Sequence, residues 1–360
     1  MKKETALACL VVSITMFAFT SCSRQQPTFR VAVLGFEAGE LGERRNRVAE
    51  YGAHRLEGEL GASVDFFIPE AGEDLEYLFS GTEDAYDLVV TLGSPSALAA
   101  LAVRPQGWEG SLVALDFESS QPVQGEGEVT LVRYRLEEGA YVCGYLAAWL
   151  SARNDHPLTN SMPLVAFIGS RDDPMLPYYT SGFDRGVKAG APNAGSLDYY
   201  LEHEDDASKA RSMAEEAVKK GADIIFCAPG AFNAEVLEVA YEKKALVILS
   251  GADRADESPD HVLTSLVFRD DNAIFEAVRA AKDGDLPPGK LVWGGDLGTW
   301  SLAPFRFHDG YVVKELRESL EDQAHKARDM NFPHSLTPAW GSVLAIGLRP
   351  GSQVFRPIHS

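Results

Sequence analysis

The sequence predicts an α/β fold of two doubly wound lobes, each built on a parallel β-sheet and joined to the other by a hinge. Short apolar runs typical of buried strands alternate with segments of helical periodicity, in two successive series. An almost wholly apolar helix, expected from residue 136 to about residue 151, separates the two series. The remaining chain then crosses back, so that about three crossovers join the lobes into a clamshell that closes by rotation.

The first series defines lobe 1, which is expected to comprise residues 29–134 together with 268–288. Because strands and helices alternate here, the sheet is expected to be parallel. The expected strands are 29–36, 64–68, 86–92, 112–117 and 129–134. The expected helices are 43–60, 73–80, 97–103 and 272–281. One face of the first helix is expected to carry Val48, Tyr51, Gly52 and Leu56.

The second series defines lobe 2, expected to comprise residues 138–266 together with 290–360. It opens with a strand at 164–168, a loop of turn formers (GSRDDP) and a helix with apolar or small residues at helical spacing. Ligands of open α/β sheets bind beyond the carboxyl ends of the strands, so this loop is expected to form one wall of a small-molecule cleft. The later expected strands are 197–201, 223–227, 246–250, 262–267, 291–294 and 342–348, and the later helices are 207–220, 233–243 and 310–328.

The N-terminal residues have the pattern of a lipoprotein signal peptide, expected over residues 1–21. A short basic start precedes an apolar stretch, 6–20, that is too short to span a bilayer comfortably. Small residues precede Cys22, as lipoprotein signal peptidase requires, although Phe19 replaces the usual aliphatic residue. Cys22 is therefore expected to carry the lipid anchor, with residues 22–28 as a polar tether. A plain secretory signal and an uncleaved anchor are the alternatives.

The composition argues against a nucleic-acid partner and against catalysis. The formal net charge is −20, whereas binding to a phosphate backbone needs clustered Lys and Arg. The His and Cys residues lack metal-ligand spacing, and Cys143 and Cys227 are expected to be buried and inert. The sequence has no nucleophile elbow, P-loop or dinucleotide-binding glycine pattern. We therefore expect no metal, no cofactor and no enzymatic activity.

Four stretches of the sequence carry a resemblance to a known family. They are 137–144 (EEGAYVCG), the strand, loop and helix of 163–193, the run 221–265, and 302–305 (LAPF). In this order they resemble the basic membrane protein (Bmp) family, the purine-nucleoside-binding lipoproteins of ABC transporters. The resemblance covers residues 28–310. It implies a type I periplasmic-binding-protein fold, a nucleoside-like ligand, and a permease and an ATPase as partners.

Several departures from the family pattern bear on the ligand. The first loop, 35–41 (GFEAGEL), is shortened and lacks the Asn and Phe that hold the base in the family, so Phe36 is expected to stack in their place. The run 250–254 (SGADR) lacks the first Asp of the family's GVDxDQ motif. Phe268, Asp296 and Trp300 stand where the family has Lys, Lys and a small apolar residue. The resemblance therefore supports fold and location better than nucleoside specificity.

The ligand-binding residues are expected at strand ends and in cleft-side loops. Asp116, Asp172 and Asp253 supply carboxylates that accept hydrogen bonds from a sugar diol or a base. Their alternative roles are a turn cap, an N-cap and a solvated loop residue, respectively. Asp172, and not its neighbour Asp173, matches the family's loop aspartate. Aromatic rings offer stacking faces, although any single ring is more often a core residue. The remaining expected residues are Phe36, Ser94, Phe117, Tyr179, Phe232 and Trp300.

The sequence therefore predicts a lipid-anchored, extracytoplasmic substrate-binding protein of an ABC transporter, with a nucleoside-like molecule bound between its lobes. If Arg171 and Arg254 reach the cleft, an acidic ligand is the alternative, because guanidinium groups bind carboxylates and phosphates. A ligand-binding sensor or a structural lipoprotein without a transport role is the alternative function.

Overall fold

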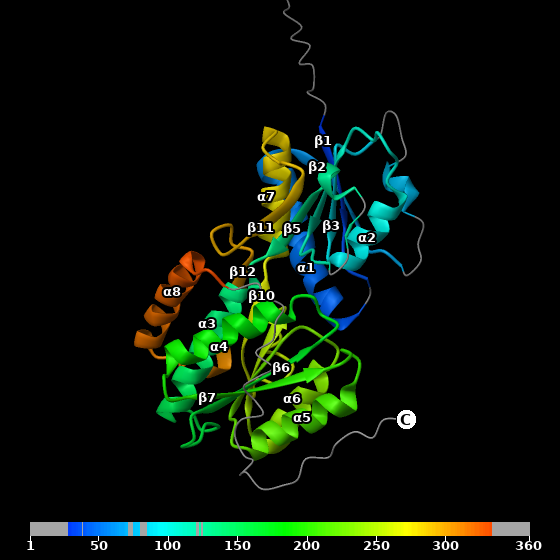
Figure 1. Cartoon of the computed structure of the whole chain (residues 1–360). Coiled ribbons are helices and arrows are strands. Elements are labelled where there is room, and N and C mark those ends of the chain that lie inside the picture. The colour runs from blue at the N-terminus through cyan, green and yellow to red at the C-terminus, as the bar shows by residue number, and fades with distance from the viewer. Residues whose placement is uncertain are drawn as a thin grey trace, which may run out of the picture.

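The structure, a computed structural model, consists of two lobes that each contain their own sheet (Figure 1). This arrangement confirms the predicted α/β fold of two doubly wound lobes. The structure describes residues 28–332 except 38, 71–74, 80–84, 120–121 and 124. The expected signal peptide (1–21), Cys22, the tether up to residue 27 and the expected strand 342–348 lie outside the described residues.

Lobe 1 is a six-stranded parallel sheet with helices on both faces (Figure 1). In spatial order its strands are β11 (Gly289–Trp293), β5 (Thr130–Tyr134), β4 (Ser111–Leu115), β3 (Leu88–Leu92), β1 (Phe29–Leu34) and β2 (Ala62–Phe67). Its helices are α1 (Glu40–Arg55), α2 (Ser94–Val103) and α7 (Asp270–Asp283). Alternate residues of a strand point to opposite faces. Val33 therefore packs in the core shared with α1 and α7, whereas Leu34 packs in the core with α2.

Helix α1 differs from the expected helix in its bounds and in its buried face. It begins at Glu40 and continues past Arg55 as a π-helical turn, Leu56–Leu60. Tyr51, expected on the buried face, is 63% exposed. The buried face instead begins with Arg45 and Asn46 and continues through Ala49. The described part of the expected helix 73–80 contains only a 3₁₀ turn, Glu76–Phe79, and a second 3₁₀ turn covers Glu126–Glu128.

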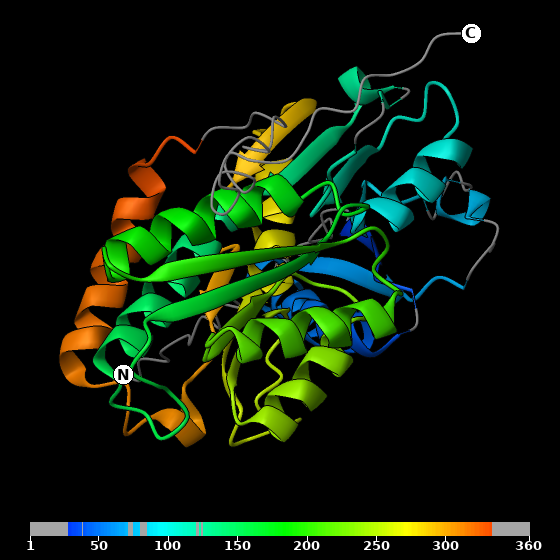
Figure 2. The same cartoon turned by 60° about the horizontal axis from the view of Figure 1, so that its bottom comes forward.

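Lobe 2 is a second six-stranded sheet. In spatial order its strands are β12 (Trp300–Leu302), β10 (Val262–Phe268), β9 (Leu246–Gly251), β8 (Ile224–Cys227), β6 (Leu164–Ser170) and β7 (Gly195–Leu201). Its helices are α3 (Leu136–Arg153), α4 (Leu176–Gly190), α5 (Ala207–Lys219), α6 (Asn233–Lys243) and α8 (Lys314–Asp329). Figure 2 shows α5 and α6 on one side of β6 and β7, and α4 on the other. The edge strand β12 runs antiparallel to β10, which departs from the all-parallel expectation.

Glycines allow α3 and α4 to pack unusually closely. A Cβ atom at Gly182 would lie 2.2 Å from the Glu137 carbonyl oxygen, and one at Gly186 would lie 2.0 Å from that of Tyr141. Between these glycines, Phe183 is fully buried. The Gly-Phe-x-x-Gly pattern of the sequence therefore serves helix packing, and α4 is held firmly behind the loop that follows β6.

Three crossings join the lobes: from β5 to α3, from β10 to α7, and from β11 to β12. The Glu138 carboxylate links the first crossing to the third, because it accepts hydrogen bonds from Gly295 N (2.8 Å) and Trp300 Nε1 (2.9 Å). Strand β11 pairs with β5 along its whole length. This pairing corrects the expected start of lobe 2 at residue 290, since residues 289–293 belong to the lobe 1 sheet. A short apolar run predicts a strand but not the sheet in which it pairs.

Candidate functional site

The carboxyl ends of both sheets face the junction between the lobes. Strands β5, β10 and β11 all leave their sheets toward the other lobe at their carboxyl ends. Their parallel neighbours therefore end at the same junction. Ligands of open α/β sheets bind at such strand ends, so the interlobe junction is the candidate site.

On the lobe 1 side, Arg45 is the centre of a buried polar cluster. Its guanidinium donates to both carboxylate oxygens of Asp270, from Nε to Oδ2 at 2.9 Å and from Nη2 to Oδ1 at 2.7 Å. Its Nη1 donates to Asp116 Oδ2 at 2.7 Å. The Tyr134 hydroxyl adds a hydrogen bond to Asp270 Oδ1 at 3.1 Å. Three segments far apart in the sequence, the start of α1, the end of β4 and the start of α7, are thereby held together.

The Arg45 guanidinium also lies over two aromatic rings. Its Cζ is 4.0 Å from the ring centroid of Phe36 and 4.6 Å from that of Phe268. Burial lowers the pKa of Arg45, but the Asp270 and Asp116 carboxylates outweigh burial, so that the pKa is raised overall and the guanidinium stays charged. Burial raises the pKa of Asp270, and the Arg45 charge opposes this rise. The cluster is therefore a desolvated group of charges whose members depend on one another.

On the lobe 2 side, Asp173 lies in the loop that follows β6, and Tyr179 lies in the first turn of α4. Asp173 Oδ1 accepts a hydrogen bond from Met175 N (2.7 Å), just before α4. Burial raises the pKa of Asp173 to about 7, and the negative charge of Asp116 adds to this rise. Burial also raises the pKa of Tyr179, with Asp173 and Asp116 adding to the effect. Because Asp116 belongs to lobe 1, its charge acts across the junction on groups of lobe 2.

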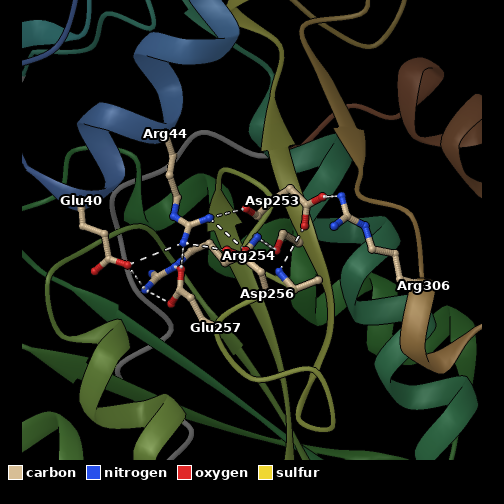
Figure 3. A network of polar contacts seen from close by, with 9 residues as sticks. Glu40, Arg44, Asp253, Arg254, Asp256, Glu257 and Arg306 are labelled. Atoms are coloured by element: carbon tan, nitrogen blue, oxygen red, sulfur yellow. Dashed lines mark hydrogen bonds and ion pairs between the residues drawn. The ribbon is translucent and has the colours of Figure 1, made fainter.

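A surface network ties the first turns of α1 to the loop after β9 (Figure 3). We call this network the interlobe latch; its members are Glu40 and Arg44 of lobe 1 and Asp253, Arg254, Asp256 and Glu257 of lobe 2. Arg44 Nη1 donates to Asp256 Oδ1 at 3.0 Å and to the Asp253 carbonyl oxygen at 3.2 Å, and Arg44 Nη2 lies 3.1 Å from Glu257 Oε1. Glu40 lies 3.8 Å from Arg254 Nη2. The two lobes thus touch directly through side chains of opposite charge.

A second contact joins the lobes on the β5 side. The Arg133 guanidinium of β5 lies over the Tyr178 ring of α4, with its Cζ 4.1 Å from the ring centroid. The same guanidinium donates to Glu137 Oε2 at 2.8 Å at the start of α3. The junction is therefore flanked by arginine contacts on both sides.

The structure links Phe36 and Asp116 through Arg45, but it packs Tyr179 into lobe 2 with its ring 6.4 Å from that of Phe226, and it engages Asp172 elsewhere. Asp172 accepts hydrogen bonds from the Ser170 hydroxyl and from Glu204 N, the latter at 3.2 Å. Burial raises the pKa of Asp172, but these hydrogen bonds outweigh it, so that the pKa is lowered overall. Asp172 therefore fastens its own loop within lobe 2. The pKa of the neighbouring Asp173, by contrast, is raised by burial and by the charge of Asp116 in lobe 1.

The other expected site residues have identifiable partners or lie in a core. The Ser94 hydroxyl donates to the Glu118 carbonyl oxygen at 2.8 Å. Asp253 forms an ion pair with Arg306 (Figure 3), and Trp300 donates to Glu138. Phe117 and Phe232 are buried in the cores of lobe 1 and lobe 2. Phe117 also borders a small cavity of about 90 Å³ beside β11.

Sequence reasoning missed Arg45, Asp270 and Tyr134. For Arg45 a signal was present: it lies four residues before Ala49 and seven before Gly52, which places it on the buried face of α1. A charged residue at such a position needs a buried partner of opposite charge. No comparable local signal identified Asp270, whose partners are 225 and 136 residues away in the chain.

Other features of the described residues concern metal ligands, cysteines and membrane-spanning helices. Among them no group of three or more His, Cys, Asp or Glu residues is placed to hold a metal ion. Cys143 and Cys227 are buried and unbridged, as expected. Burial raises the pKa of the Cys227 thiol to about 12, which keeps it protonated and unreactive. No helix within the described part of the chain has the length and apolar character needed to cross a membrane.

Two lobes joined by three crossings, with the strand ends of both sheets at the junction, define a two-lobed solute-binding protein. Solved structures share this fold. An ABC-transporter solute-binding protein from Aeropyrum pernix K1 has a TM-score of 0.64 and 18% identity, with 86% of this chain and 94% of that chain covered. A transcriptional activator of the comK gene from Bacillus halodurans has a TM-score of 0.64 and 21% identity, with 85% and 100% covered. At such identities the likeness shows the fold alone.

The chain belongs to the Bmp family, described as "ABC transporter substrate-binding protein PnrA-like", whose model matches residues 67–296. It is 26% identical over 261 residues to a CD4+ T-cell-stimulating antigen of Listeria monocytogenes, covering 68% of this chain and 69% of that protein. It is 27% identical over 192 residues to basic membrane protein B of Borrelia garinii, covering 52% and 53%. It is 24% identical over 329 residues to an uncharacterized lipoprotein of Pyrococcus abyssi, covering 86% and 76%.

The family membership confirms the predicted resemblance and sets the class of function. The chain is an ABC-transporter solute-binding protein and not an enzyme. This class implies a small-molecule ligand, with a permease and an ATPase as partners.

Proposed function

We propose that this protein is a lipid-anchored receptor that captures a nucleoside-like small molecule at the interlobe junction and delivers it to its permease. The observation that carries the proposal is the grouping of Phe36 and Asp116 around Arg45 at the strand ends of lobe 1, where the charge of Asp116 also acts on Asp173 of lobe 2. Carboxylates accept hydrogen bonds from hydroxyl and N–H groups, and aromatic rings stack on planar rings. A nucleoside presents both kinds of group in one molecule.

The lipid anchor belongs to the same proposal. The apolar start of the sequence and the small residues before Cys22 support it. The match to a protein named a lipoprotein in Pyrococcus abyssi supports it as well. Two acyl chains give stable membrane binding where one is marginal. Replacing Cys22 by Ser should therefore move the protein from the membrane fraction to the soluble fraction.

Calorimetry and thermal unfolding with a panel of nucleosides, free bases, sugars and amino acids test the ligand class. The protein is the mature chain from residue 22, with Cys22→Ser for solubility. A nucleoside at about 100-fold excess over its dissociation constant should stabilise the protein by about 2.7 kcal/mol. Asp116→Asn should weaken this binding. Stabilisation by a sugar or an amino acid, with none by any nucleoside, would contradict the proposed ligand class.

A sensor or structural lipoprotein without transport is the second candidate. The direct ion pairs between the lobes favour it, because a receptor that is already tied shut has less need of a ligand for closure. Uptake of a labelled solute into cells with and without this protein separates the two functions. Binding without any effect on uptake would favour the second candidate.

A further inference from the structure

We propose that Arg45 is a specificity-determining residue: its guanidinium occupies the lobe 1 half of the binding site and competes there with the planar group of the solute. The inference rests on the proposed function, which locates the binding site at the interlobe junction. It names the residue that decides which solutes bind. It also predicts that the protein binds nucleosides weakly because Arg45 occupies their place, and that substitution of Arg45 strengthens this binding.

The first step concerns the shape of the space that the Arg45 guanidinium occupies. Its guanidinium is planar, lies over the rings of Phe36 and Phe268, and points N–H groups at the carboxylates of Asp116 and Asp270. Aromatic faces above a plane and acceptors around its edge are also what a nucleobase requires. The guanidinium therefore uses the contacts that a base would use.

The second step is that these contacts are already taken. Arg45 is 6% exposed and Asp270 is fully buried. One Asp116 oxygen accepts from Arg45 at 2.7 Å, and the Phe36 ring lies against the guanidinium at 4.0 Å. Other contacts also hold Phe36 in place. Its ring lies so close to Gly93 that a Cβ atom there would be 2.9 Å from the ring. The Asn46 side chain forms hydrogen bonds with the Phe36 backbone N–H and carbonyl oxygen. A base can take this Asp116 oxygen as a partner and stack on this face of Phe36 only if Arg45 leaves.

The third step is the energetic consequence. When a binding-competent arrangement is only fractionally populated, the apparent dissociation constant rises by the inverse of that fraction. Moving Arg45 away leaves Asp270 without its cationic partner in a dry environment, so the competent arrangement is costly. The Arg45 side chain thus discriminates against planar solutes that need to contact Phe36 and Asp116 of lobe 1.

The test is chemical complementation of an Arg45→Ala variant. The variant leaves a guanidinium-sized space between Phe36 and Phe268, and the first probe is ethylguanidinium, the detached end of the missing side chain. Saturable thermal stabilisation by several degrees is expected in Arg45→Ala and not in the parent protein. The second probe is guanosine, whose base carries adjacent N–H donors on one edge. Its affinity should be at least tenfold higher for Arg45→Ala than for the parent protein.

The matched control is Arg279→Ala, since Arg279 is an arginine of lobe 1 whose ion pairs lie on the surface of α7. This variant should respond to neither probe differently from the parent protein. If Arg45→Ala does not fold, Arg45→Ala combined with Asp270→Asn removes the buried charge but keeps Phe36 and Asp116. This double variant should also be stabilised by ethylguanidinium and should also bind guanosine more tightly than the parent protein.

The outcomes separate this inference from the proposed function. Absence of saturable stabilisation by ethylguanidinium in the folded variant would overturn the inference and leave Arg45 a structural residue. Weaker guanosine binding to the variant than to the parent would also overturn it, because Arg45 would then be a ligand contact. If ethylguanidinium stabilises the variant and no nucleoside binds either protein, the nucleoside class falls and the role of Arg45 stands.

Discussion

Arg44 and Arg45 are neighbours on α1, yet the protein uses them in opposite ways. Arg45 points into lobe 1, where its partner Asp270 is fully buried. Arg44 points across to lobe 2, where the side chain of its partner Asp256 is 64% exposed. Successive residues of a helix are about 100° apart around the axis, so one turn of α1 serves both the site and the contact between the lobes. The comparison teaches that burial of the partners, and not the residue type, decides what each arginine does.

The largest expected effect is on stability at Arg45. Arg45→Met keeps much of the side-chain volume but leaves the Asp270 carboxylate buried without its cation. Removing one partner of a buried ion pair costs about 3–5 kcal/mol, and we expect a loss of this size in the free energy of unfolding measured with urea. Adding Asp270→Asn should restore part of the loss. If Arg45→Met loses no more than Arg279→Ala, the cluster is not the desolvated group that its geometry implies.

The next effect concerns Asp173, the lobe 2 acid that Arg45 does not neutralise. Its pKa is raised to about 7 in the folded protein, against about 3.9 in an unfolded chain. Between these values the folded state binds the proton more tightly, so this residue makes stability fall as pH rises. The Asp173→Asn variant lacks this titrating group, so its stability should not show this fall. Its free energy of unfolding should therefore rise relative to that of the parent protein as the pH is raised from about 4 to about 8.

Urea unfolding of both proteins across this pH range measures the difference. The other acids with a raised pKa, among them Asp270, Asp223 and Asp198, are present in both proteins and cancel in the comparison. A constant difference between parent and variant at all pH values would show that Asp173 keeps an ordinary pKa in the folded protein.

The fold could be predicted from the sequence because its signals are local. Buried strands and amphipathic helices repeat with periods that a single chain displays, and the strand, loop and helix of 163–193 became β6 and α4 as expected. The assignment of β11 failed because sheet partnership is not local: its partner β5 lies more than a hundred residues earlier in the chain. The same limit explains the antiparallel β12.

The site was harder to predict than the fold. The positions of Phe36 and Asp116 at strand ends could be predicted, because following a strand depends only on local order. The choice between Asp172 and Asp173 depends on which carboxylate meets Ser170 and which faces lobe 1, and adjacent residues cannot be separated in this way by sequence. Arg45 could have been found from the buried face of α1, whereas Asp270 required the folded arrangement of three segments.

The smallest effect is expected at the interlobe latch. Arg44→Ala should cost no more than about 1 kcal/mol in unfolding free energy, because two of its partners, Asp256 and Glu40, are exposed. A double-mutant cycle of Arg44→Ala with Asp256→Ala should give a coupling energy of similar size at low salt. This coupling should nearly vanish at about 1 M salt, where the screening length falls to about 3 Å. The stability loss at Arg45 should persist under the same salt, because buried pairs are screened much less.

The interlobe latch joins two lobes, whereas an ordinary surface ion pair joins residues of one element. Loss of the latch should therefore change the dimensions of the protein in solution. Arg44 links separate lobes, whereas Arg279 pairs with Glu276 and Asp283 within α7. Both alanine variants should lose similar stability, but only Arg44→Ala should increase the radius of gyration of the ligand-free protein in solution scattering. High salt should enlarge the parent protein in the same way. Equal radii for Arg44→Ala, Arg279→Ala and the parent at low salt would mean that α1 and the loop after β9 stay together without the latch, held by the contact of Leu41 with Gly251.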